Sequence, residues 1–103
     1  MNMSKYDLTA IITDKRGRII SIGKNSYIKT HPMQARLAKQ MGEKDRIYLH
    51  AEIHAIVKCR DLSRAHKITV IRIDKQGNYR MAKPCKICAE AIRNSGINLI
   101  EYT

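Results

Sequence analysis

Two short stretches of the chain combine residue types that bind metals and move protons. The first, L-H-A-E-I-H-A-I, contains His50 and Glu52, and the second, K-P-C-K-I-C, contains Cys85 and Cys88. A catalytic zinc takes three protein ligands and keeps one position open for water, whereas a structural zinc is closed by four. One histidine and two thiolates supply three ligands, so the spacing favours a catalytic site. Glu52 is then available as the base that takes a proton from water and returns it to a leaving group.

Other readings of the same residues stay open. A closed structural zinc would need a fourth ligand, and His54 lies one helical turn from His50, about 6 Å along the axis, whereas Cys59 would lie about 13 Å away. A redox C-x-x-C pair would leave the histidine and the glutamate without a role. A zincin is excluded, because its H-E-x-x-H motif places glutamate directly after the first histidine. Cys59 is expected to be a buried free thiol.

The surrounding pattern predicts the elements that must position these residues. Runs of β-branched residues flanking D-K-R-G indicate a β-hairpin, and Gly42 and Gly96 end two apolar-periodic helical segments. Pro84 is well placed to open the last helix. Strands alternating with helices in the second half predict parallel pairing there. The expected strands are 6–13, 18–22, 67–74 and 97–102, with a turn at K-Q-G-N before residues 79–82, and the expected helices are 33–41, 50–60 and 85–95.

Length and composition limit the class of protein. A chain of 103 residues fits a single domain, 1–103, and has no stretch approaching the roughly 20 apolar residues that cross a bilayer. Its three cysteines are an odd number with two at C-x-x-C spacing, which favours metal or redox chemistry over a disulfide framework. The expectation is a soluble protein of the cytoplasm without a membrane partner.

The net charge is +11, with 20 Lys and Arg against 9 Asp and Glu, and the basic residues are spread over the whole chain. Such a charge attracts phosphate, either on a nucleotide or along a polynucleotide. It is also compatible with nothing more than a highly soluble surface. Charge alone therefore does not choose a ligand.

The paired motifs resemble the cytidine deaminase superfamily, whose signature is H-x-E followed by P-C-x-x-C, with the glutamate not a zinc ligand. Here the first half reads His50-Ala51-Glu52 and the second Pro84-Cys85-Lys86-Ile87-Cys88. The stretch H-A-E-I-H-A-I is particularly similar to the H-A-E-x-N-A-I of deoxycytidylate deaminases. The resemblance implies that zinc is the cofactor, that the backbone at Ala51 contacts the pyrimidine, and that Asn25 holds the sugar.

The resemblance also implies a fold. We expect an α/β protein, a three-layer α/β/α sandwich with a mixed sheet of about four strands, lacking the fifth strand and terminal helix found in most members. Such a sheet would leave an exposed edge, which proteins seldom leave unprotected. The expected state is therefore a homo-oligomer.

The implied reaction is zinc-dependent hydrolysis of cytosine to uracil with release of ammonia. The resemblance favours a free cytidine or deoxycytidine nucleotide such as dCMP as substrate. Alternatives are cytosine in single-stranded DNA or RNA, adenine in RNA, and a non-catalytic relative that binds nucleic acid. Candidates for contacts with the base or phosphate are Tyr27, His31, Lys24, Lys83 and Lys86.

Overall fold

A computed structural model describes residues 7–26, 30–42 and 49–103 of the chain. Its strands are β1 (Asp7–Thr13), β2 (Ile19–Lys24), β3 (Lys67–Ile73), β4 (Tyr79–Arg80) and β5 (Leu99–Tyr102). Its helices are α1 (Pro32–Gln40), α2 (Ala51–Lys58) and α3 (Lys86–Ser95), with a short 3-10 turn, η1, at Leu62–Arg64.

The strands form one mixed sheet in which β1 lies between β2 and β3. The β1–β2 and β1–β3 pairs are antiparallel, and β5 pairs with β3 in parallel, as predicted for the second half of the chain. The two-residue strand β4 also pairs with β3, beyond the last residue that β5 reaches. Thr103 links these two strands, because its carbonyl accepts the Ala82 N–H and its hydroxyl donates to the Arg80 carbonyl.

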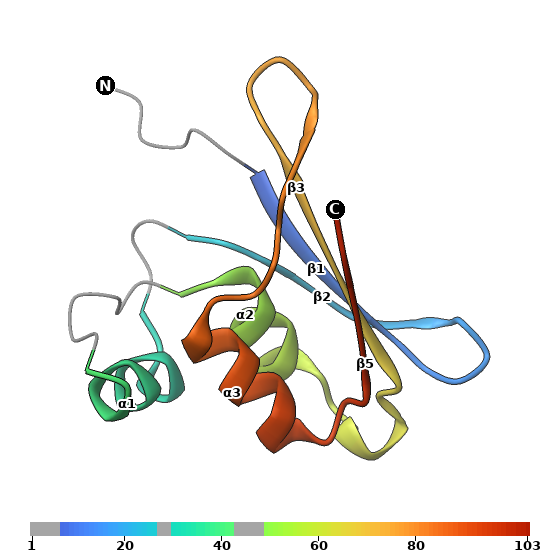
Figure 1. Cartoon of the computed structure of the whole chain (residues 1–103). Coiled ribbons are helices and arrows are strands. Elements are labelled where there is room, and N and C mark those ends of the chain that lie inside the picture. The colour runs from blue at the N-terminus through green and yellow to red at the C-terminus, as the bar shows by residue number, and fades with distance from the viewer. Residues whose placement is uncertain (1–6, 27–29, 43–48) are drawn as a thin grey trace.

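The core lies between the sheet and its helices. Ala10 and Ile12 of β1 and Ile68 and Val70 of β3 alternate along their strands and are fully buried, because α2 covers this face. The intervening residues of both strands are only partly buried. Figure 1 shows the three helices gathered on one side of the sheet, with α3 beside α2. The described chain therefore has two layers.

The expected three-layer sandwich with about four strands was wrong. The sheet has five strands, so it does not lack the fifth, and the described helices cover one face. The fifth strand is counted because the turn after β3 folds Tyr79–Arg80 back onto Arg72 and Ile73. A run of two residues is too short for an alternating apolar and polar pattern to predict a strand.

Two hairpins of the sheet use the same turn. The Asp14 carboxylate accepts the backbone N–H groups two and four residues later, and Asp74 does the same in its own turn. Gly17 and Gly77 follow at φ of 81° and 86°, a backbone conformation that glycine adopts without steric cost. Each aspartate thus fixes a reversal of the chain. Among the described helices, none is long and apolar enough to cross a membrane.

Candidate metal centre

Two neighbouring helices present the residues of the metal centre from their first turns. His50 is the N-cap of α2, Cys85 is the N-cap of α3, and Cys88 follows within the first turn of α3. These three side chains can each direct one donor atom to a common point, with all donor atoms within 4.8 Å of one another. The predicted ligands are therefore brought together.

The spacing of the donors fits zinc. His50 Nδ1 lies 3.2 Å from Cys88 Sγ and 3.6 Å from Cys85 Sγ. Tetrahedral zinc with Zn–N of about 2.1 Å and Zn–S of about 2.3 Å separates a nitrogen from a sulfur ligand by about 3.6 Å. An imidazole nitrogen with two thiolates is also a donor set that suits zinc.

The cysteines share one negative charge unequally. A hydrogen bond from Cys88 is the main cause that lowers the pKa of Cys85, to about 3, and a hydrogen bond from His50 lowers it further. Burial acts in the opposite direction but is outweighed, so Cys85 is a thiolate at neutral pH. Hydrogen bonding to that thiolate and burial raise the pKa of Cys88 well above its ordinary value. Because metal ligation requires thiolates, a bound cation would release the remaining proton.

Glu52 is held beside the ligands but is not one of them. Its side chain is only 6% exposed, and burial is the main cause that raises its pKa. A backbone hydrogen bond at Glu52 itself, the charge of His50 and a hydrogen bond with Cys88 lower the pKa, whereas the charge of Cys85 raises it further. The carboxylate therefore lies within interaction range of all three ligands. A desolvated carboxyl group at this position has a stronger affinity for a proton than one in water.

A residue that sequence reasoning did not single out helps to position the first ligand. Gln34 of α1 is fully buried, and its side-chain carbonyl oxygen accepts the backbone N–H of His50 at 3.2 Å. The first N–H groups of a helix have no partner within the helix, and Gln34 satisfies one at the start of α2. The feature that points to Gln34 is its complete burial, and this can be recognised only from the packed structure and not from the sequence.

His54 does not join the metal cluster. Its Nδ1 lies 3.0 Å from the backbone nitrogen of Lys24 and 3.1 Å from the Lys24 carbonyl oxygen, so this histidine ties α2 to the end of β2. The group of possible ligands found in the described residues contains His50 and the two cysteines alone. Cys59 lies at the other end of α2, where it is the C-cap. The closed structural zinc that needs His54 as fourth ligand therefore has no support.

Two residues expected to hold the substrate, Asn25 and Ala51, lie in segments next to the metal centre. Asn25 follows β2, and its side-chain oxygen accepts the Leu8 N–H at 3.1 Å. The next residue, Ser26, donates its N–H to Leu49, directly before His50, so this loop runs alongside the metal centre. The Ala51 side chain is fully buried at the start of α2.

The candidates for base or phosphate contact are more dispersed. His31 caps α1, with its Nδ1 accepting the Met33 N–H, which gives it a structural role. Lys83 and Lys86 flank Cys85 with exposed side chains, and Lys24 is exposed at the end of β2. Tyr27 lies outside the described residues.

The comparison with protein families agrees with this geometry. The model of the cytidine and deoxycytidylate deaminase zinc-binding region matches residues 1–103. The chain belongs to this family, and its His50, Cys85 and Cys88 cluster is consistent with the family's zinc site. No curated protein sequence is similar enough to the chain to count as a match.

Proposed function

We propose that the protein hydrolyses cytosine to uracil in a free cytidine or deoxycytidine nucleotide such as dCMP, releasing ammonia. The observation that carries this proposal is the desolvated Glu52 carboxylate beside a three-donor cluster. A structural zinc site has no need of a buried carboxylate that is not a ligand, and burying a carboxylate costs free energy.

The chemistry assigned to the chain is proton transfer. Zinc bound by the cluster would supply a Lewis acid that makes water nucleophilic near neutral pH. Glu52 accepts a proton from the attacking water as oxygen bonds to C4 and delivers it to the ring nitrogen. It then accepts the second proton from the oxygen now on C4 and delivers it to the amine, which leaves as ammonia when the C4–N bond breaks. The raised pKa of Glu52 suits both the uptake and the delivery of a proton, because it brings the proton affinity of the carboxylate closer to that of the groups with which it exchanges the proton.

Substrate contacts follow from the same proposal. The backbone at Ala51 would meet the pyrimidine, since the first N–H groups of α2 lack helical partners. Asn25 would offer its amide to the sugar while its oxygen holds Leu8. Lys83, Lys86 and Lys24 are proposed to attract the phosphate.

The test of Glu52 is the Glu52→Gln variant. It should keep one zinc per chain and the wild-type melting temperature but lose at least about 100-fold in turnover, because an amide cannot accept a proton at neutral pH. Zinc content, thermal unfolding and ammonia release are measured on the same preparation. Glu101→Gln is the control, since Glu101 is exposed on β5 and should leave turnover unchanged. Parallel loss of zinc and turnover in Glu52→Gln would assign Glu52 to the metal instead.

A second candidate substrate is cytosine within single-stranded DNA or RNA, favoured by the net charge of +11. The two substrates are separated by their products. Cytidine, dCMP and a cytosine-containing oligonucleotide are offered to equal amounts of zinc-loaded protein, and the replacement of an amine by oxygen is followed by mass. We expect uracil in the mononucleotide. Uracil formed only within the strand would reverse the choice, and no conversion at all would favour a non-catalytic relative that binds nucleic acid.

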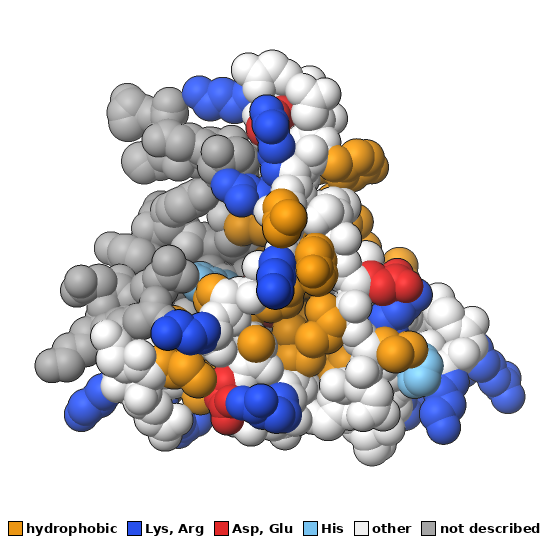
Figure 2. Space-filling model, in the orientation of Figure 1, with side chains coloured by type: hydrophobic (Ala, Val, Ile, Leu, Met, Phe, Trp, Pro, Cys, Tyr) orange, Lys and Arg blue, Asp and Glu red, His pale blue; other side chains and the backbone are white. Residues whose placement is uncertain are grey.

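We further propose that the protein self-associates and acts in a reducing compartment such as the cytoplasm. Leu99, Ile100 and Tyr102 of β5 are 47%, 43% and 46% exposed. Figure 2 shows apolar side chains gathered on the face where β5 lies. An apolar strand at the edge of a sheet is suited to pair with a second copy. A reducing environment keeps the three free cysteines available to metal.

A further inference from the structure

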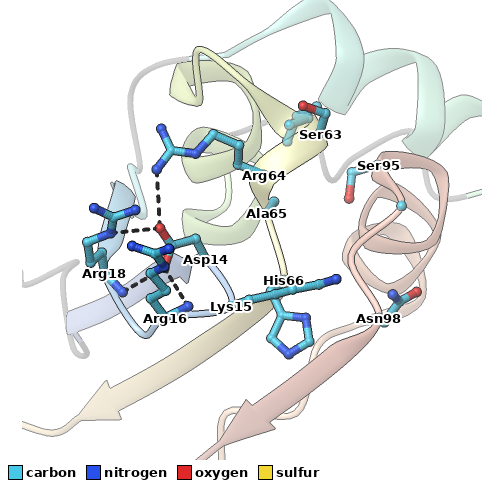
Figure 3. A pocket seen from close by; sticks show the side chains of 12 residues that line it. Asp14, Lys15, Arg16, Arg18, Ser63, Arg64, Ala65, His66, Ser95 and Asn98 are labelled. Carbon is cyan, nitrogen blue, oxygen red and sulfur yellow. Dashed lines mark hydrogen bonds and ion pairs between the residues drawn. The ribbon is translucent and has the colours of Figure 1, made fainter.

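A second concentration of polar side chains lies far from the metal centre. It lines a pocket of about 580 Å³ formed by the turn after β1, the η1 segment and the end of α3 (Figure 3). The metal ligands lie at the first turn of α3, whereas the pocket reaches Ser95 and Gly96 at its last turn. A helix of 10 residues is about 15 Å long, so the two sites are at opposite ends of α3.

The pocket is strongly cationic. Lys15, Arg16, Arg18 and Arg64 line it, and Asp14 is the one acidic residue among its lining residues, which leaves three net positive charges. The partial negative charge at the carboxyl end of α3, about half a unit, is too small to offset them. The pocket therefore attracts an anion with more than one charge.

Asp14 arranges two of these cations. Its carboxylate accepts from Arg18 Nε at 3.1 Å and from Arg64 Nη2 at 3.2 Å (Figure 3), although the two arginines are 46 residues apart in sequence. Backbone hydrogen bonding from Arg18 is the first cause that lowers the pKa of Asp14 to about 2, so it stays ionised. The arginine side chains remain 60% and 51% exposed. Each guanidinium has five N–H donors, so each retains donors for a ligand.

The remaining walls are suited to oxygen-rich groups rather than to a base. Asn98 adds an amide, whereas the hydroxyls of Ser63 and Ser95 already donate to Asp61 and to the Ile92 carbonyl. In Figure 3 the Lys15 side chain extends across the pocket towards the side that carries Ser95 and Asn98. Among the residues that line the pocket, the one ring is the imidazole of His66, and there is no tyrosine. A base usually stacks on an aromatic side chain, whereas phosphate oxygens pair with guanidinium forks.

The second turn of the sheet shows which basic side chains the backbone hydrogen bonds of such a turn do not need. Its Asp74 makes the same pair of backbone hydrogen bonds, but Gln76 and Asn78 stand where the first turn has Arg16 and Arg18. Neutral side chains therefore suffice at these two positions, although Asp74 also pairs with an arginine, Arg80, at 2.8 Å and Lys75 stands where the first turn has Lys15. The backbone hydrogen bonds of the first turn thus do not depend on the charge of Arg16, which leaves that charge available for a ligand.

We propose that this pocket binds a run of two or more neighbouring phosphate groups, independently of the metal centre. Such a run occurs in the backbone of a polynucleotide and in a free polyphosphate such as the tail of a nucleoside triphosphate. A volume of about 580 Å³ lies within the range of about 300–1,000 Å³ of ligand pockets. The inference goes beyond the proposed deamination, because it assigns a binding site that does not touch zinc or Glu52.

Binding is tested on the zinc-loaded protein with inorganic tripolyphosphate, hexathymidylate and orthophosphate as probes. The Lys15→Gln/Arg16→Gln variant removes two charges from the pocket. The matched control is Lys39→Gln/Lys75→Gln, which removes two charges from exposed positions outside it, Lys75 being the counterpart of Lys15 in the second turn. Affinity is measured by calorimetry over a range of salt concentrations, and folding by circular dichroism.

We expect tripolyphosphate to bind at least tenfold more tightly than orthophosphate. If the polynucleotide backbone is the natural source, hexathymidylate binds as well, with a log-log salt slope of about −3 for four phosphate contacts, and the pocket variant halves that slope. Tripolyphosphate binding without hexathymidylate binding identifies a free polyphosphate. In either case the control variant should lose much less affinity than the pocket variant.

The proposal is overturned if neither polyphosphate probe binds more tightly than orthophosphate, or if the two double variants weaken binding equally. Should the pocket variant unfold, the single changes Lys15→Gln and Lys75→Gln make the same comparison at equivalent positions of the two turns. Because the readout is binding, loss of the proposed deamination would leave the result intact.

Discussion

Cys88 is the most buried of the three metal donors, and we expect it to be essential for zinc. Cys88→Ser should lose most of its zinc, because a hydroxyl is a much poorer ligand than a thiolate. Metal binding in such a site contributes to folding, so stability should fall as well. In a domain of this size a loss of only 1 kcal/mol lowers the melting temperature by about 4–8 °C. Zinc content and thermal unfolding measure the two effects.

The control for this change is Cys59→Ser, which alters a thiol at the opposite end of α2. It should keep a full complement of zinc. A chelator should lower the melting temperature of this control to that of Cys88→Ser without added chelator. If Cys88→Ser retained one zinc per chain, the assignment of this ligand would be wrong.

Gln34 acts on the metal through His50, as a positioning residue. Gln34→Leu keeps a buried side chain of similar size but leaves the His50 N–H without its acceptor. Partners that orient metal ligands typically contribute about 10–100-fold to metal affinity, and we expect a loss in this range. Competition with a coloured chelator measures the zinc dissociation constant.

Two further variants show whether the effect comes from the lost acceptor. Gln34→Glu retains an acceptor oxygen and should recover part of the zinc affinity, whereas Gln40→Leu, an exposed position on the same helix, should leave affinity unchanged. A lower melting temperature of Gln34→Leu with unchanged zinc affinity would assign Gln34 a role in packing alone.

At the scale of elements, the contact between β2 and α2 depends on Gly23. A Cβ added there would overlap the backbone of α2 at the Ala55 nitrogen and the Ala51 oxygen. Ser21 reinforces the same contact by donating its hydroxyl hydrogen to the Ala55 carbonyl at 2.7 Å. The strand and the helix thus approach as closely as their backbones allow.

Gly23→Ala should therefore destabilise the fold by about 2–3 kcal/mol, because backbone atoms of α2 must move. Gly96→Ala is the comparison: a Cβ there meets open space, but its φ of 86° makes a side chain unfavourable by about 1 kcal/mol. Denaturant unfolding gives both free energies. A smaller cost at Gly23 than at Gly96 would show that β2 and α2 separate easily.

The sequence predicted most elements because their signals are local. Pro84 and Gly96 bracket α3, whose observed bounds are Lys86–Ser95, and the 3.6-residue period placed α2. The metal ligands were found for the same reason, since each half of the motif is contiguous. By contrast, no periodicity says which face of a sheet a helix covers, and β4 is too short to show one.

The roles of single polar residues were beyond the sequence for a different reason. Gln34 bonds to a residue 16 positions away, and Arg64 meets Asp14 across 50 positions. These contacts exist only after the sheet and helices have packed. His54 shows the same limit, because proximity in sequence made it a possible ligand while its actual partner is Lys24 at the end of β2.

At the scale of the whole molecule, we expect assembly through the β5 edge. Light scattering should give a mass of at least about twice the 11.8 kDa of one chain. Ile100→Lys should shift the protein to monomer, because a charge on an edge strand opposes pairing with another strand. Ile22→Lys is the matched control, since Ile22 is 41% exposed against 43% for Ile100 but lies on β2 at the other side of the sheet. A monomeric wild-type protein would contradict the expectation.

The pairing of β3 with β5 has a consequence for how the metal is acquired. His50 and Cys85 are 35 residues apart, and closing a loop of that length in a flexible chain costs about 3 kcal/mol of entropy. Strand β3 lies inside this loop, and its ladder with β1 and β5 already holds the two helix starts together. In the folded chain the zinc ligands are therefore already positioned, and zinc should bind quickly to the folded protein and slowly to the unfolded chain.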